Sequence, residues 1–220
     1  EEGACCKGSV GVLRRMYELG VRMMTLTWNH ENELAAPQRN PGGVLVPQTE
    51  KGLTGKGFEF LAEMERMHMI VDVSHLSDKG FWDIARHSTR PFAASHSNCR
   101  ALAPHTRNLT DEMIRALSEH GGIAGLNYYA PFLDADPTHP EKCRSTAALI
   151  AKHAAHYKQV GGAQMIALGS DFDGIDGPHQ LENAAFLPLL ADAPRQEGFT
   201  EDEGGGIYHR NAMRFFEENL

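Results

Sequence analysis

The stretch from Met69 to His96, MIVDVSHLSDKGFWDIARHSTRPFAASH, decides the fold of this chain. A short apolar run at each of its ends predicts a β-strand that finishes in a histidine, and residues 77–87 between the two runs predict a helix. Because the carboxyl ends of successive parallel strands open into one mouth, we expect His75 and His96 to point into a common site. The pattern indicates a metallohydrolase.

The same alternation of strand, loop and helix continues on both sides of this stretch. Apolar residues at a spacing of three or four predict the helices, and continuous apolar runs predict strands that are buried on both faces. Such an order is typical of an α/β protein with a parallel sheet. The predicted strands are 21–27, 69–74, 91–95, 122–127 and 164–170, and the main helices are 9–19, 57–67, 77–87, 145–160, one that Thr110 caps, and one from Thr200 to about Glu218.

Polar residues follow the carboxyl ends of the predicted strands, which favours a (β/α)8 TIM-type barrel over an open sheet. A complete barrel usually needs about 250 residues, and this chain has 220. No internal repeat or linker divides residues 1–220, so we expect one metallo-dependent hydrolase barrel domain. The polar stretch 28–54, rich in glycine and proline, predicts a long functional loop.

Composition excludes several kinds of partner. The chain carries 21 lysines and arginines against 29 acidic residues, a net charge of -8, which argues against nucleic acid and anionic membranes. No apolar run is long enough to cross a bilayer. The cysteines lack zinc-finger spacing and are expected to be free thiols in a reducing compartment. They are Cys5, Cys6, Cys99 and Cys143.

Imidazole nitrogens are ligands that zinc prefers, so the two strand-end histidines are metal-ligand candidates. A further strand-like run ends at Asp171, between Gly169 and Gly174. These glycines let the backbone turn sharply and present the carboxylate. Asp171 can act there as a metal ligand, as a general base, or as the acid that gives a proton to a leaving amine.

Six motifs that occur in order along the chain resemble the renal (membrane) dipeptidase family of binuclear zinc peptidases. Each motif alone is weak, but their order and spacing are specific. The motifs are Glu2-Gly3-Ala4, residues 20–27 (GVRMMTLT), residues 71–75 (VDVSH), Ser95-His96-Ser97, Arg107-Asn108-Leu109, and residues 169–174 (GSDFDG).

The resemblance implies a zinc-dependent dipeptidase. By likeness to the family, Glu2 bridges two zinc ions, and His75 and His96 are ligands of the second ion. Arg107 binds the terminal carboxylate of the dipeptide, for which a guanidinium fork suits better than a lysine. A metal-bridging hydroxide attacks the peptide carbonyl, and Asp171 is the proton shuttle that takes the proton of the water and delivers it to the leaving amine.

The chain departs from the family pattern in two places near the site. The family has a His-x-Asp pair that supplies the other metal, and no such pair precedes Glu2. We therefore expect a barrel that lacks roughly its first two to three strands. Many members have a histidine where this chain has Trp28, so we expect His30 to steady the oxyanion instead and Trp28 to wall the substrate pocket.

Two alternative functions stay open at the level of sequence. A catalytically inactive or single-metal relative would act as a binding or structural protein. Another hydrolase on the same barrel would act on a lactam or a cyclic amide, which has little use for Arg107. For the dipeptidase we expect a cytoplasmic bacterial enzyme without nucleic-acid or membrane partners, acting on small dipeptides as a homodimer.

Overall fold

A computed structural model describes residues 1–220 except 39–45, 135–138, 140–141 and 178. It divides into two compact units, Glu1–Ala94 with Phe216–Leu220, and Ser95–Phe215. Part of the predicted loop 28–54 therefore lies outside the described residues. None of the described helices is both long enough and apolar enough to cross a membrane.

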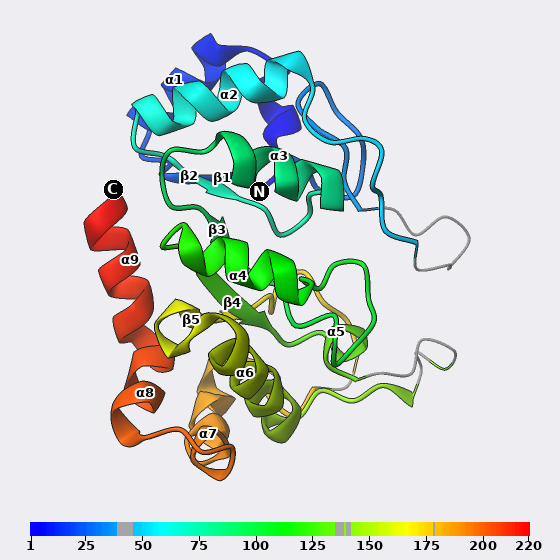
Figure 1. Cartoon of the computed structure of the whole chain (residues 1–220), viewed down its shortest axis with the longest axis vertical. Coiled ribbons are helices and arrows are strands. Elements are labelled where there is room, and N and C mark those ends of the chain that lie inside the picture. Colours follow the sequence, from blue (N-terminus) through cyan, green and yellow to red (C-terminus); the bar gives the residue numbers. More distant parts are fainter. Residues whose placement is uncertain (39–45, 135–138, 140–141, 178) are drawn as a thin grey trace. The chain divides into compact units, whose positions relative to one another are not determined.

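The first unit consists of parallel strands with helices between them. Met23 of the first strand is in register with Ile70 of the second, and Asp72 with Ala93 of the third. Figure 1 shows its first two helices side by side. The strands are β1 (Met23–Thr25), β2 (Ile70–Asp72) and β3 (Ala93–Ala94), and the helices are α1 (Val10–Glu18), α2 (Gly55–Arg66) and α3 (Asp78–His87).

Hydroxyl side chains start each of these three helices. Ser9, Thr54 and Ser77 each accept a hydrogen bond from the backbone N–H three residues on, which satisfies a donor that the first turn leaves without a helical partner. Gly20, at φ 104°, follows the end of α1, where a side chain would be strained. The predicted helices 9–19 and 77–87 are confirmed to within two residues at each end.

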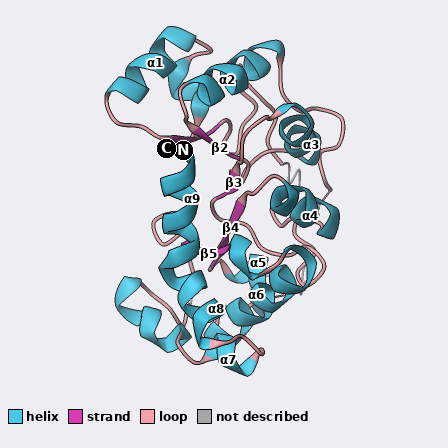
Figure 2. Ribbon diagram, turned by 60° about the vertical axis from the view of Figure 1, so that its left-hand side comes forward, coloured by secondary structure: helices cyan, strands magenta, loops and turns pink. Residues whose placement is uncertain are grey.

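The second unit contains two parallel strands, β4 (Ile123–Asn127) and β5 (Ile166–Ser170). A Cβ on either Gly125 or Gly169 would overlap the carbonyl oxygen of Ser95, so only glycine lets these backbones approach so closely. The helices here include α4 (Asp111–Glu119), which Thr110 caps as predicted, α5 (Ala130–Leu133) and α6 (Ala147–Gly161). Helices α4 and α6 pack against each other, and both contact β4 (Figure 2).

The end of the chain differs from the prediction of one continuous helix. Thr200 starts the helical run as expected, in a reciprocal capping box with Glu203. A π-helical turn then interrupts the run, and beside it the Asn211 amide donates to the carbonyls of Ala163 and Ile166. The segments are η5 (Ala184–Leu190), α7 (Ala193–Gln196), α8 (Glu201–Gly205), the π turn η6 (Gly206–Arg210) and α9 (Asn211–Asn219).

Candidate active site

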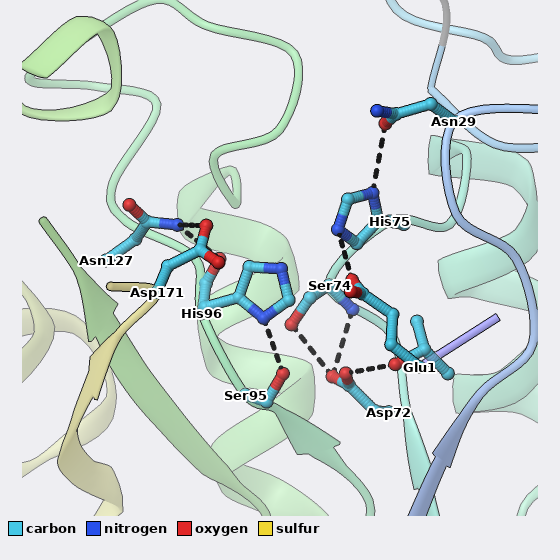
Figure 3. A network of polar contacts seen from close by, with 10 residues as sticks. Glu1, Asn29, Asp72, Ser74, His75, Ser95, His96, Asn127 and Asp171 are labelled. Carbon is cyan, nitrogen blue, oxygen red and sulfur yellow. Dashed lines mark hydrogen bonds and ion pairs between the residues drawn. The ribbon is translucent and has the colours of Figure 1, made fainter. Parts of the chain in front are cut away.

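In the first unit, His75 lies in the turn that follows β2 and is buried. Its Nδ1 is 3.2 Å from the side-chain oxygen of Asn29, and its Nε2 is 2.7 Å from a carboxylate oxygen of Glu1 (Figure 3). An amide oxygen can only accept, so the proton of the neutral ring lies on Nδ1. The lone pair of Nε2 then faces the Glu1 carboxylate.

This arrangement fits a metal ion. A nitrogen lone pair and a carboxylate oxygen 2.7 Å apart repel each other unless a proton or a cation lies between them. Zinc takes imidazole nitrogen and carboxylate oxygen as ligands, and a ligating histidine typically donates its other N–H to an oxygen that fixes the ring. Asn29 provides that oxygen for His75.

Asp72, the last residue of β2, holds the turn that carries His75. It is 1% exposed and accepts three hydrogen bonds, from the Thr25 hydroxyl at 2.7 Å, the Ser74 hydroxyl at 2.8 Å and the Ser74 N–H at 3.1 Å (Figure 3). A carboxylate with these donors has its charge compensated inside the protein. Asp72 therefore serves to fix the strand end.

Glu2 lies next to this cluster in sequence but has other partners. Its Oε1 accepts from the Ala4 N–H at 3.2 Å and from the Asn32 amide at 2.9 Å. It caps the short 3-10 helix η1 (Gly3–Cys6) with φ at 73°. The carboxylate that the structure brings to His75 is thus that of Glu1, which the sequence interpretation had not singled out.

Trp28, predicted to wall the substrate pocket, lies near His75, and His30, predicted to steady the oxyanion, lies near Trp28. The Trp28 ring centroid is 6.1 Å from that of His30, in an edge-on arrangement, and 6.5 Å from that of His75. Trp28 keeps 44% of its surface exposed. A half-exposed indole beside a ligand-like histidine can wall a pocket for a small substrate.

In the second unit, His96 follows β3 in sequence and is 9% exposed. Its Nδ1 lies 2.7 Å from the Ser95 hydroxyl (Figure 3). Hydroxyls can donate or accept, so Ser95 can hold the ring with either nitrogen protonated.

Asp171 directly follows β5 and has φ at 73°, an uncommon value for a residue with a side chain. The Asn127 amide, at the end of β4, donates to Asp171 Oδ2 at 2.9 Å and to the His96 carbonyl at 3.4 Å (Figure 3). A Cβ on Gly174 would lie 2.5 Å from Asp171 Oδ1. Strand β4, through Asn127, and the glycine together fix the carboxylate.

Buried amides hold the loop that carries Arg107. Asn98 donates to the Asn127 and Phe132 carbonyls, and Asn108 donates to the carbonyls of Phe132 and Ala103. All three asparagines are fully buried. Because each amide makes several hydrogen bonds, the loop has a defined conformation.

The guanidinium of Arg107 lies 5.4 Å from the centroid of the Phe132 ring, and the backbone N–H of Arg107 donates to His105 Nδ1 at 3.1 Å. Burial first, and then the charges of Arg107 and Arg100, lower the pKa of His105 to about 4. His105 is therefore neutral near pH 7, and the positive charge beside Phe132 is that of Arg107. Such a group suits the carboxylate of a small substrate.

Sequence reasoning missed Glu1, Asn29, Asp72 and Asn127 as functional residues. Asn127 ends a predicted strand, as the run before His75 does, so the position at a strand end could have indicated Asn127 as well. Asn29 and Glu1 reach His75 from irregular segments, for which the sequence has no periodic signal.

Comparison with known proteins assigns nearly the whole chain to one protein family. A family model described as "Membrane dipeptidase (Peptidase family M19)" matches residues 1–219. An uncharacterised protein of Klebsiella pneumoniae is 37% identical over 92% of this chain and 73% of its own length. An uncharacterised dipeptidase of Schizosaccharomyces pombe is 34% identical over 96% of this chain, which spans 49% of that protein.

Solved structures agree with this family assignment. A metallopeptidase from Rhodobacter sphaeroides, crystallised with a phosphinate mimic of the dipeptide L-Ala-D-Ala, has a TM-score of 0.88 and 32% identity. The match covers 97% of this chain and 60% of that one. A dipeptidase of peptidase family M19 has a TM-score of 0.87 at 32% identity. The likeness confirms the predicted barrel class of α/β fold, and this chain spans roughly 60% of the solved chains.

Proposed function

The chain belongs to the membrane dipeptidase family, peptidase family M19, and on that premise we propose that it carries the zinc site and the substrate-binding residues of a dipeptidase. The observation that supports this most strongly is the group around His75. Its Nδ1 lies 3.2 Å from the side-chain oxygen of Asn29, and its Nε2 lies 2.7 Å from a carboxylate oxygen of Glu1. These contacts are typical of a histidine that binds zinc, and less typical of a histidine without a metal.

The zinc ligands in this proposal are His75, His96 and the carboxylate of Glu2, with Glu1 as a second carboxylate beside His75. Zinc, when bound, lowers the pKa of a water molecule and polarises the peptide carbonyl, and a complete site holds two ions. The family resemblance supports Glu2 and His96, and the contacts described above support His75 and Glu1.

The other residues bind the substrate and move protons. Arg107 pairs with the free carboxylate of the dipeptide, with Phe132 supporting the guanidinium. Asp171, held by the Asn127 amide, accepts the proton of the attacking water and donates it to the amine that leaves. Trp28 lines the pocket, and His30 donates to the oxygen on which negative charge develops.

Hydrolysis assays test this proposal. We expect the zinc-loaded full chain to cleave L-Ala-D-Ala or another dipeptide, and a chelator to abolish the reaction. His75→Ala should be inactive, whereas the control His209→Ala, at an exposed position, should keep the activity. Zinc-loaded protein that cleaves no dipeptide would contradict the proposal and favour a binding protein.

A second assay separates a dipeptidase from a lactam hydrolase. We expect Arg107→Lys to raise KM for a dipeptide about tenfold, because the bidentate pairing with the carboxylate is lost. The same variant should change KM little for a dipeptide amide, which has no carboxylate. Equal effects on the two substrates would remove Arg107 from carboxylate binding.

A further inference from the structure

Three sulfur atoms gather near the start of the chain, within the first unit. Cys5 and Cys6 close the 3-10 helix η1, and Met16 lies on α1. The Met16 Sδ is 3.9 Å from Cys5 Sγ and 3.7 Å from Cys6 Sγ.

The two cysteines differ in burial. Cys5 is exposed, whereas Cys6 is fully buried. The geometry of adjacent residues disfavours a disulfide between Cys5 and Cys6. Adjacent Cα atoms lie about 3.8 Å apart across a trans peptide, less than the roughly 4.4 Å at which disulfides begin.

The spacing of the sulfurs suits a metal ion with three ligands. Metal–sulfur bonds of about 2.3 Å in a trigonal plane place the sulfurs about 4 Å from one another. The two measured separations, 3.7 and 3.9 Å, are close to that value.

The chemistry of the ligands selects the kind of ion. Two thiolates and a thioether are soft ligands, which favour Cu(I), whereas zinc prefers thiolate, imidazole and carboxylate. We propose that Cys5, Cys6 and Met16 form a binding site for one Cu(I) ion, separate from the proposed zinc site and independent of the proposed function.

Binding at this site is a ligand exchange without a redox step. Cu(I) forms a bond to each cysteine sulfur and to Met16 Sδ, and the two thiol protons go to solvent. Burial, the largest cause, and the neighbouring Cys5 raise the pKa of the Cys6 thiol to about 12. The Cys6 thiol therefore stays protonated near pH 7, and a strongly thiophilic ion is needed to displace its proton.

The test is an anaerobic titration of the zinc-saturated full chain with Cu(I), in competition with the chromophoric chelator bathocuproine disulfonate. We expect one Cu(I) per chain, with no release of zinc. Cys5→Ser, at an exposed position where folding is not at risk, should weaken binding about a hundredfold, and Met16→Leu about tenfold. The matched controls Cys143→Ala and Met213→Leu should bind as the parent does.

Three results would overturn the proposal. The first is failure of the parent chain to hold one Cu(I) against the chelator. The second is equal affinity in Cys5→Ser and Cys143→Ala, which would leave the sulfur contacts as packing only. The third is zinc release that matches copper uptake, because the copper would then occupy the histidine site.

Discussion

The imidazole of His75 is positioned by residues from three separate segments of the first unit. Asn29 fixes the ring, Asp72 fixes the turn, and Glu1 supplies a negative oxygen at Nε2. A ligand held in this way needs little reorganisation when a metal binds.

The two adjacent glutamates have different places in the proposed zinc site. We expect Glu2→Gln to lower zinc affinity more than Glu1→Gln, because Glu2 occupies the position of the bridging carboxylate in the family pattern. Glu1→Gln should lower it about tenfold, through loss of the charge beside His75. Competition with a zinc-responsive dye measures both, with Glu31→Gln as the control. A larger loss of zinc affinity in Glu1→Gln would assign the role of the bridging carboxylate to Glu1.

Gly174 makes room for the carboxylate of Asp171. Gly174→Ala places a Cβ 2.5 Å from Asp171 Oδ1 and must displace it. We expect kcat to fall about a hundredfold with KM nearly unchanged, since a shift of about 1 Å in a catalytic group is enough for such a loss. Gly204→Ala, where a Cβ meets nothing within 4 Å, is the control. Unchanged kcat in Gly174→Ala would remove Asp171 from the proton transfer.

Among the elements, helices α1 and α2 are joined by a charged cluster. Glu63 on α2 accepts from Arg14 of α1 at 2.6 Å and from Arg66 at 2.6 and 2.9 Å. These hydrogen bonds, with that of Arg66 the largest cause, lower the pKa of Glu63 from 4.5 to about 2. A lowered pKa means that the stabilisation is complete above about pH 4.5 and is lost as the pH falls towards 2.

Glu63→Gln should therefore destabilise the protein by about 1 kcal/mol at pH 7, a value that allows for the exposed arginines. The difference from the parent should vanish as the pH approaches 2. Denaturant unfolding at several pH values measures it, with Glu59→Gln on the same helix as the control. A constant difference at all pH values would show that charge is not its cause.

In the second unit, His153 of α6 ties this helix to neighbouring loops. Its Nδ1 accepts from the Cys99 N–H at 3.0 Å, and its Nε2–H donates to the Leu133 carbonyl at 3.1 Å. Burial lowers the pKa of His153 to about 4. The unfolded chain thus binds a proton before the folded chain does, so stability falls as the pH drops from about 6.5 to 4.

We expect His153→Gln to reduce this acid-induced loss by about 1–3 kcal/mol. Denaturant unfolding at pH 7, 5.5 and 4 measures the loss, and His209→Gln serves as the exposed control. If the parent and His153→Gln lose the same stability over this range, protonation of His153 does not cause it.

The helices and strands show which parts of the structure the sequence predicts. Strand positions and helix starts were predictable because burial and capping are local: the runs before His75 and Asp171 and the caps at Ser9 and Thr110 are where the sequence placed them. The contacts of Asn29 and Asn127 were not predictable, because they join residues 46 and 44 positions apart through loop geometry. Hydrophobic periodicity carries no information about such contacts.

At the scale of the whole molecule, the sequence predicts one domain, and the structure describes two compact units. A single domain should unfold in one cooperative transition. Both tryptophans, Trp28 and Trp82, lie in the first unit, so their fluorescence reports on that unit alone. Hydrogen exchange of β4 and β5 reports on the second.

We expect both probes to give the same denaturation midpoint. Coincident curves would support the prediction of one barrel domain. Separate midpoints, with one unit unfolding before the other, would contradict it.

Elemental analysis of the purified protein, after zinc loading and gel filtration, tests directly whether the strand-end histidines bind zinc. We predict bound zinc in the parent chain and in His209→Ala, and loss of zinc in both His75→Ala and His96→Ala. Zinc contents in the two strand-end variants equal to that of the parent would show that neither histidine is a zinc ligand.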